Sequence, residues 1–354
     1  MKKVSLLLYL GALLTGGVQA QSSVTLYGIV DTGLVYSKVD GFASRTGIEN
    51  GIYAPSRFGI RGREQLNSDL AALFVLENGF NPDTGTQGNG GRLFGRDAYL
   101  GLQSKNLGAV RIGRTTNLGQ RWAALIASPF GLSYGIGSVT TTFSFDDTEY
   151  GGGRVDNAIY YESPKLAGFT MAGGYSLNIN GAEVPGSNNN TRLGDVAVRY
   201  EAGPVSAILH YMTTRTPGTQ RNPSTYLAAG SYDFGVIKAH VGYNRIKNAL
   251  SNAGSAYSST ALGSLYDSGW VSTTRNDDNA YSIGVTVPVG NEAVMGGYQK
   301  LTSQKMDVYA IGYVYKLTKR TSFHAFAAFG SYRDFNANVD RDRKQFGLGL
   351  NHMF

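Results

Sequence analysis

Residues 345–354, QFGLGLNHMF, end the chain and follow one pattern throughout. Every second residue is apolar, aromatic or His, and this set comprises Phe346, Leu348, Leu350, His352 and Phe354. Successive side chains of a β-strand point to opposite faces. The alternation therefore predicts a strand with one apolar face.

Many stretches upstream repeat this alternation with charged residues on the polar face. In 154–163, for example, Arg154 and Asp156 lie on one face, and Val155 and Ile159 lie on the other. Counting such runs predicts about sixteen strands, near 24–36, 56–65, 69–80, 92–103, 108–114, 154–163, 168–178, 192–201, 204–213, 225–234, 236–247, 279–288, 292–301, 306–317, 320–332 and 342–354.

The connections between these strands alternate between short and long. Turns such as 202–203 and 318–319 are tight, whereas 37–55, 115–153 and 248–278 are long. Barrels of the outer membrane have short periplasmic turns and long extracellular loops. A soluble sandwich also alternates, but acids and bases on the polar face and Tyr near strand ends favour a membrane barrel. We therefore expect an all-β fold, a 16-stranded antiparallel transmembrane β-barrel, as a single domain over 21–354.

The third long loop departs most from the pattern, because the alternation stops for nearly forty residues between Arg114 and Arg154. Loops of this length are functional or disordered. This one carries apolar residues from Trp122 to Phe130 and again at Phe143. We expect it to fold into the barrel, pack this cluster against the wall and narrow the lumen.

Composition excludes several classes of function. The 354 residues include 48 Gly and 23 Tyr but no Cys, so disulfides and thiolate metal sites are excluded. The four His are far apart in sequence, and no nucleotide-binding glycine motif is present. A formal charge of +7 is too small to indicate a nucleic-acid partner. We expect no cofactor and no metal.

The first twenty residues predict export. Lys2 and Lys3 precede an apolar segment, 4–14, and 18–20 supplies small residues for cleavage. We expect 1–20 to be a signal peptide and the mature protein to begin at Gln21. Removal of the two lysines lowers the formal charge from +7 to +5.

Seven motifs in order resemble the general trimeric porins of Neisseria- and Burkholderia-type Gram-negative bacteria: SSVTLYGIVDTGL, SRFGIRGREQL, LENGF, GRLFGRDAYLGL, GAVRIGRTTNL, RVDNAIYYESPKLAGF and GLGLNHMF. They cover nearly the whole mature chain. The resemblance implies a homotrimer of sixteen-stranded barrels in the outer membrane, each narrowed by an inward-folded third loop. It also implies that the terminal Phe354 is a signal for the barrel-assembly machinery.

In that family, basic residues of the barrel wall face acidic residues of the third loop. The motifs place Arg57, Arg96 and Arg154 on the wall, with Glu77 of LENGF as the wall carboxylate. Arg61 lies four residues after Arg57 and therefore on its face.

Two other wall positions, Arg111 and Arg114, are additional candidates for the pore lining. The alternative is that wall arginines only pair with acids such as Glu77 or Asp156 and hold the barrel together. Alternation with Arg96 also puts Leu100 and Leu102 on the lumen face. Either a β-bulge resets the register there or Arg96 is wrongly assigned.

The third loop carries Asp146, Asp147 and Glu149, which its position places opposite the arginines. A solvated surface patch or a divalent-cation site would use the same residues. The loop also contains Ser133 in a G-x-S-x-G motif, which in esterases requires a strand–turn–helix and a later acid and His. Its Gly-rich flanks do not favour that arrangement.

The sequence thus predicts an outer-membrane channel for passive diffusion of small hydrophilic solutes and ions, with a mild preference for anions. Outer-membrane lipid and lipopolysaccharide are its expected surroundings. A substrate-specific channel, an adhesin using loops such as 248–278, and a barrel hydrolase using Ser133 are the alternatives. We expect no enzymatic activity.

Overall fold

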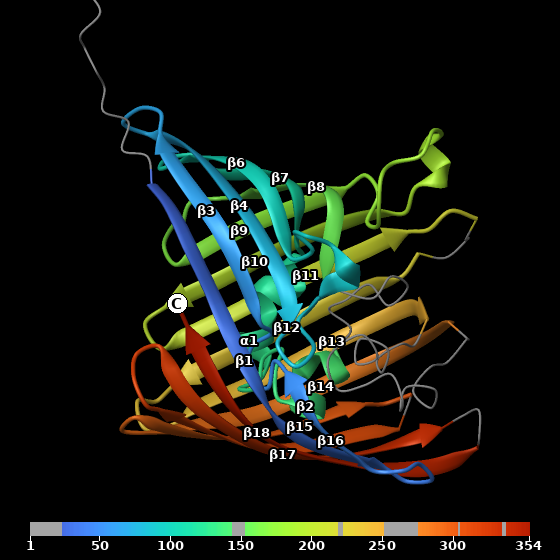
Figure 1. Ribbon diagram of the computed structural model, residues 1–354. Helices are drawn as coiled ribbons and strands as arrows, with labels where there is room; N and C mark the ends of the chain where they lie inside the picture. Colours follow the sequence, from blue (N-terminus) through green and yellow to red (C-terminus); the bar gives the residue numbers. More distant parts are fainter. Residues whose placement is uncertain (1–22, 144–152, 219–221, 251–274, 304, 335–337) are drawn as a thin grey trace, which may run out of the picture.

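The computed structural model describes residues 23–143, 153–218, 222–250, 275–303, 305–334 and 338–354 (Figure 1). The expected signal peptide, 1–20, and most of loop 248–278 lie outside these ranges. The strands are β1 (Ser23–Val39), β2 (Arg45–Asn50), β3 (Arg57–Gln65), β4 (Leu70–Asn81), β5 (Thr86–Gln87), β6 (Asp97–Ser104), β7 (Gly108–Thr116), β8 (Arg154–Glu162), β9 (Phe169–Ser176), β10 (Arg192–Ala202), β11 (Val205–Arg215), β12 (Ser224–Asp233), β13 (Lys238–Leu250), β14 (Arg275–Val289), β15 (Glu292–Leu301), β16 (Met306–Lys316), β17 (Thr321–Asp334) and β18 (Val339–Met353).

Short helical segments occur in the loops. They are η1 (Asn89–Gly91), η2 (Gly119–Ala123), α1 (Ala124–Ala127), η3 (Gly135–Gly137), η4 (Val139–Thr141) and η5 (Ser187–Asn189). No helix of the described residues is long and apolar enough to span a membrane.

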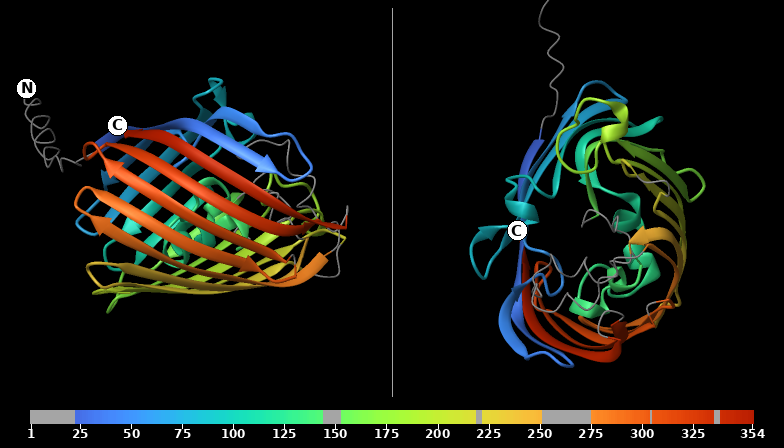
Figure 2. Two further views of the ribbon diagram at one scale, coloured as in Figure 1. Left: turned by 90° about the horizontal axis from the view of Figure 1, so that it is seen from below. Right: turned by 90° about the vertical axis from the view of Figure 1, so that its right-hand side faces the viewer.

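The strands close into an antiparallel barrel (Figures 1 and 2). The first and last strands pair from Ile29↔Met353 to Val39↔Arg343, which closes the sheet. β2 and β3 act as one interrupted strand, because both pair with β1. β5 pairs only with the end of β4. Of the eighteen strands, β2 and β3 therefore count once and β5 is excluded, which leaves the predicted 16.

The outer face of the barrel is apolar and has aromatic rings near both ends of its strands. Neighbouring rings lie 4.5–5.2 Å apart in the pairs Phe169–Tyr200 and Tyr232–Phe234 near the short turns, and Tyr211–Tyr226, Tyr243–Tyr281 and Tyr298–Tyr309 near the long loops. Two such belts are typical of barrels whose ends lie at the two membrane interfaces. The predicted tyrosines at strand ends are confirmed.

Two predicted details of register were wrong. Strand β6 begins at Asp97 rather than at 92. Arg96 therefore lies before the strand, and the alternation of side chains in β6 does not determine which face Arg96 occupies. Leu100 and Leu102 are 65% and 50% exposed on the outer face, and neither a bulge nor a misassigned Arg96 is needed. Val155 is buried rather than on the outer apolar face, because the register shifts between Gly113 and Thr115.

Candidate functional site

The described part of the segment between β7 and β8, residues 117–143, leaves the sheet and folds into the barrel, where it lies against the wall (Figure 2). Its start is fixed by the buried carboxylate of Asp195 on β10. This carboxylate accepts hydrogen bonds from the Leu118 backbone N–H at 2.8 Å and the Tyr160 hydroxyl at 2.8 Å. It also lies 2.7 Å from Nε2 of His210. A buried acid is stable when its oxygens are fully used, as here.

Apolar side chains hold the middle of the loop against the wall, as predicted. Trp122 and Phe130 are buried, and the guanidinium of Arg199 lies 4.4 Å from the centre of the Trp122 ring. The Phe130 ring rests on strand glycines: a Cβ added to Gly297 or Gly312 would lie 3.0 or 2.9 Å from it. Leu125 differs from its neighbours in the predicted cluster, since it is 68% exposed.

The tip of the loop is anchored by Tyr134, which adopts a left-handed conformation (φ 67°). Its N–H donates to the carbonyl of Ile52 at 2.9 Å, and its hydroxyl lies 2.9 Å from Nδ1 of His324. Burial raises the pKa of the Tyr134 hydroxyl well above its ordinary value, so this group stays protonated. The next contact is between the Ile136 N–H and Oε1 of Gln345 on β18, at 2.9 Å.

The inward break between β2 and β3 supports the tip from the other side. Asp31 on β1 holds this break by accepting hydrogen bonds from the N–H groups of Tyr53 and Ala54 at 3.2 and 3.1 Å. The Tyr53 ring then stacks on His324 with 4.1 Å between ring centres. The loop tip is therefore held between the first and the last strands of the barrel.

A cluster of arginines lies on the wall formed by β3 to β8. Arg96 donates from Nε to Oε1 of Glu77 at 2.5 Å, and the Tyr27 hydroxyl donates to Oε2 of the same acid at 2.8 Å. Arg57 and Arg154 both interact electrostatically with Arg96 and Glu77, so the three predicted arginines and the wall carboxylate are brought together.

Neither Arg57 nor Arg154 forms an ion pair with a carboxylate of the described residues, and the Nε of each is buried without a hydrogen bond there. The alternative given above, in which these arginines pair with Glu77 or Asp156, is therefore not what the structure shows for Arg57 and Arg154. Glu77 pairs with Arg96, and Asp156 pairs with two other arginines.

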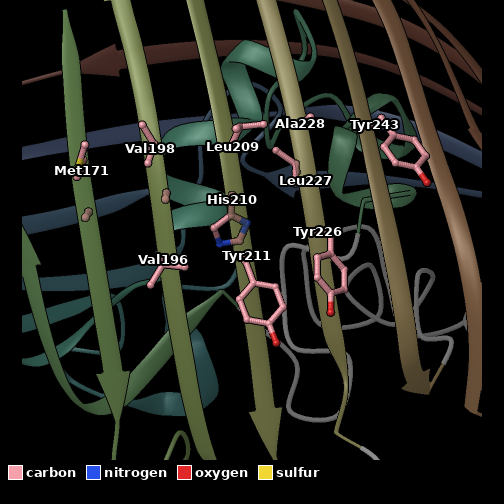
Figure 3. A pocket seen from close by; sticks show the side chains of 12 residues that line it. Met171, Val196, Val198, Leu209, His210, Tyr211, Tyr226, Leu227, Ala228 and Tyr243 are labelled. Atoms are coloured by element: carbon pink, nitrogen blue, oxygen red, sulfur yellow. The ribbon is translucent and has the colours of Figure 1, made fainter. Parts of the chain in front are cut away.

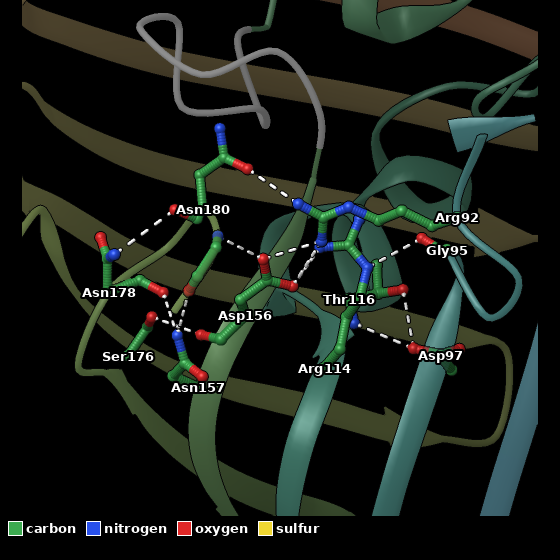
Figure 4. A network of polar contacts seen from close by, with 11 residues as sticks. Arg92, Gly95, Asp97, Arg114, Thr116, Asp156, Asn157, Ser176, Asn178 and Asn180 are labelled. Atoms are coloured by element: carbon green, nitrogen blue, oxygen red, sulfur yellow. Dashed lines mark hydrogen bonds and ion pairs between the residues drawn. The ribbon is translucent and has the colours of Figure 1, made fainter. Parts of the chain in front are cut away.

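The Asp156 network extends this cluster toward the long loops (Figure 4). Arg92 donates to both carboxylate oxygens of Asp156, at 2.9 and 2.8 Å, and Arg114 bonds the same acid. The Gly181 N–H adds a hydrogen bond of 2.7 Å. Arg92 was missed as a site residue: it stands at the start of the predicted strand 92–103, but the structure places it in the loop before β6.

The other predicted lining residues have separate positions. Arg61 lies on the lumen face, 5.2 Å from the centre of the Tyr27 ring. Arg111 lies 5.5 Å from the Tyr99 ring and 3.8 Å from Oε2 of Glu162. The loop acids Asp146, Asp147 and Glu149 lie outside the residues that the structure describes.

Two predictions on single residues concern Ser133 and Phe354. The Ser133 hydroxyl donates to the backbone carbonyl of Tyr53, while both ring nitrogens of His324 lie against other hydroxyls, those of Tyr134 and Ser322. This arrangement is not that of a nucleophile with its base. Phe354 exchanges backbone hydrogen bonds of 3.0 Å with Gly28, so the last residue completes the closing ladder.

A closed barrel with polar groups inside, apolar groups outside and an inward loop defines a pore-forming outer-membrane protein. The family model for Gram-negative porins matches residues 7–335, and the chain belongs to that family. It therefore forms a general porin channel in the outer membrane.

Individual relatives and solved structures agree with this family assignment. An outer membrane porin protein of Bordetella pertussis is 34% identical over 393 residues and covers 100% of both chains. The structure of the anion-selective porin from Comamonas acidovorans is similar with a TM-score of 0.74 and 25% identity, covering 94% of this chain and 100% of that one. The trimer form of OmpT, an outer membrane protein of Vibrio cholerae, gives a TM-score of 0.64 at 15% identity, covering 94% of this chain and 99% of its own, and shows the shared fold.

Proposed function

We propose that this porin prefers anions and that Arg57, Arg96 and Arg154 set this preference at the narrowest part of the pore. The observation that carries the proposal is the absence of an ion pair at Arg57 and Arg154 within the described residues, although both lie in the cluster of Arg96 and Glu77. A guanidinium is charged at any working pH. Two guanidinium groups without an ion pair to a carboxylate of the described residues therefore attract anions from the lumen. The anion selectivity of the Comamonas protein supports the same direction.

The loop acids Asp146, Asp147 and Glu149 are proposed to face this cluster and to divide the field across the pore between a positive and a negative side. Arg61, Arg111 and Arg114 are proposed to extend the positive side along the wall. In such a field, small hydrophilic solutes and ions are sorted by charge as well as by size.

The test is the reversal potential of the purified protein in planar bilayers under a salt gradient. We expect a sign that corresponds to anion preference. A cation-selective reversal potential would contradict the proposal. Competition by a single solute in the same recordings would show a substrate-specific site instead.

A homotrimer is proposed as the assembled form. Most outward positions of β3, β4, β6 and β7 are apolar, for example Phe58, Phe74 and Leu100, and none of the described outward positions there carries Tyr. Tyrosine belts mark the surface that meets the membrane interfaces, so a sector without Tyr is suited to a second copy of the chain, and this sector is proposed for that role. Channel closure in three equal steps in single-channel recordings would support a trimer, and closure in one step would contradict it.

The remaining partners follow from the location. Outer-membrane lipid and lipopolysaccharide are proposed to contact the apolar outer face, and the barrel-assembly machinery is proposed to recognise the strand that ends at Phe354. Deletion of Phe354 is expected to lower the amount of folded protein in the outer membrane. Equal amounts would contradict the role of this residue.

A further inference from the structure

An apolar groove lies on the outer face of the barrel across β9 to β13, away from the pore (Figure 3). It is open toward the surroundings of the barrel and has a volume of about 550 Å³. Outward side chains from neighbouring strands form it, including Met171, Val196, Leu209 and Ala228. The rings of Tyr211 and Tyr226, 4.9 Å apart, close it toward the long loops.

Small residues make this part of the surface hollow. Gly194 has no positive φ, so the backbone does not require glycine there. A Cβ at Gly194 would meet only the Thr213 methyl, at 3.8 Å, and one at Gly173 would meet Val196 at 3.6 Å. Both positions could hold a larger side chain. The space is therefore open because glycine occupies these positions, not because the backbone requires glycine there. Because Gly194 has no side chain, the surface between the groove and Arg192 at the start of β10 is not blocked.

Positive charges without acidic partners lie at that end. Arg192 and Arg215 are directly opposite one another in the β10–β11 ladder, on the outward face. The ammonium of Lys247 lies 5.9 Å from the centre of the Tyr226 ring. None of these three forms an ion pair with a carboxylate of the described residues, and Nε of Arg192 is buried without a hydrogen bond in this part of the chain.

Three other outward cations of the same rim are neutralised, whereas Lys38 and Lys344, outside the groove, face each other without an ion pair to a carboxylate of the described residues. Arg245 pairs with Asp277 at 2.9 Å, Lys300 with Asp307 at 3.5 Å and Arg333 with Asp340 at 3.0 Å. Like charges directly opposite each other in a sheet are destabilising. The facing arginines at the top of the groove are therefore suited to share an anion that the protein itself does not supply.

We propose that the groove and these arginines bind one lipopolysaccharide molecule, with an acyl chain in the groove and a phosphate between Arg192 and Arg215. Val196 lies four positions after Arg192, a distance of about 13 Å along a strand, so one molecule can reach both the phosphate site and the apolar groove. Arginines bind phosphate through paired, charge-assisted hydrogen bonds. This site deepens the lipid contact proposed above and rests on the location of the barrel in the outer membrane.

The test uses the full-length protein, purified as the folded assembly and delipidated in detergent. Diphosphorylated lipid A is added, and the bound lipid is counted by native mass spectrometry. We expect one saturable lipid per chain. The double variant Arg192→Ala with Arg215→Ala is expected to weaken binding at least tenfold. Ala228→Phe fills the groove while both arginines stay, and it is expected to weaken binding as well.

A matched control removes the same charge elsewhere on the outer rim. Lys38 and Lys344 are directly opposite one another in the β1–β18 ladder, outside the groove lining. The double variant Lys38→Ala with Lys344→Ala should change lipid binding less than twofold. An equal loss in this control would overturn the site in favour of general charge attraction. Unchanged binding by Ala228→Phe would overturn the acyl part of the proposal.

Other ligands distinguish the remaining explanations. If phosphatidylglycerol binds as tightly, the site is for a phospholipid, and if inorganic phosphate alone competes fully, only an anion site exists. A change of oligomeric state in Ala228→Phe would show that a second copy covers the groove. Conductance and reversal potential should be those of the parent protein in every variant. Failure of the lipid-binding proposal can therefore be told apart from failure of the anion-channel proposal.

Discussion

Removal of Arg57 and Arg154 together should shift the selectivity of the pore toward cations. In water, a unit charge about 6 Å from a passing ion contributes roughly 0.7 kcal/mol. Screening at 0.1 M salt, with a Debye length of about 10 Å, lowers this to roughly 0.4 kcal/mol. Each arginine stabilises an anion and destabilises a cation by this amount. Loss of both arginines therefore changes the free-energy difference between anion and cation by roughly 1.5 kcal/mol, which is about tenfold in the permeability ratio. The lower dielectric constant near a protein surface makes this a minimum.

The assay is the reversal potential of the Arg57→Ala, Arg154→Ala double variant beside the parent protein in the same salt gradient. The Lys38→Ala, Lys344→Ala variant serves as control, because it removes the same formal charge from the outer face. It should leave the ratio unchanged. A double Arg57/Arg154 variant whose ratio changes less than twofold would refute the reasoning, since these arginines would then lie away from the ion path.

Three other changes test the loop and the assembly. Asp195→Ala leaves Leu118, Tyr160 and His210 without their acceptor and is expected to lower the thermal unfolding temperature, whereas Asp195→Asn, which keeps an acceptor, should lower it less. Phe130→Ala removes the ring seated on strand glycines, at about 3–5 kcal/mol for such a truncation, and should increase open-channel noise; recordings as quiet as the parent's would contradict its anchoring role. Leu100→Arg places a charge in the sector without Tyr and should yield monomers on a sizing column, and an intact trimer would exclude this sector from the interface.

Alternation was enough to predict the barrel, because each strand between lipid and water keeps one apolar and one polar face. Leu348 and Leu350 of the last strand lie outside as expected, and Gln345 lies inside. The start of β6 could not be predicted in this way: the predicted strand began at 92, but Arg92 and Arg96 both precede the observed strand, which begins at Asp97. Only the ladder to β4 shows where pairing begins.

The wall arginines were located by motif, but their partners were not. The bond between Arg92 and Asp156 joins residues 64 positions apart, and sequence spacing carries no information about such a pair. The Asp195 anchor of the loop was missed for a similar reason. Its donors come from the loop, β8 and β11, which meet only in the folded barrel.

The attachment of the loop tip has a consequence for the order of assembly. Tyr134 is bound by Ile52 near the start of the chain and by His324 near its end, and Ile136 is bound by Gln345, 209 residues away. These partners are adjacent only after the first and last strands have joined. The inward position of the loop tip is therefore reached late in folding. If the first and last strands fail to pair, the sheet stays open and the loop tip has no complete set of partners inside it. Ordering of the loop tip would therefore indicate that the barrel has closed.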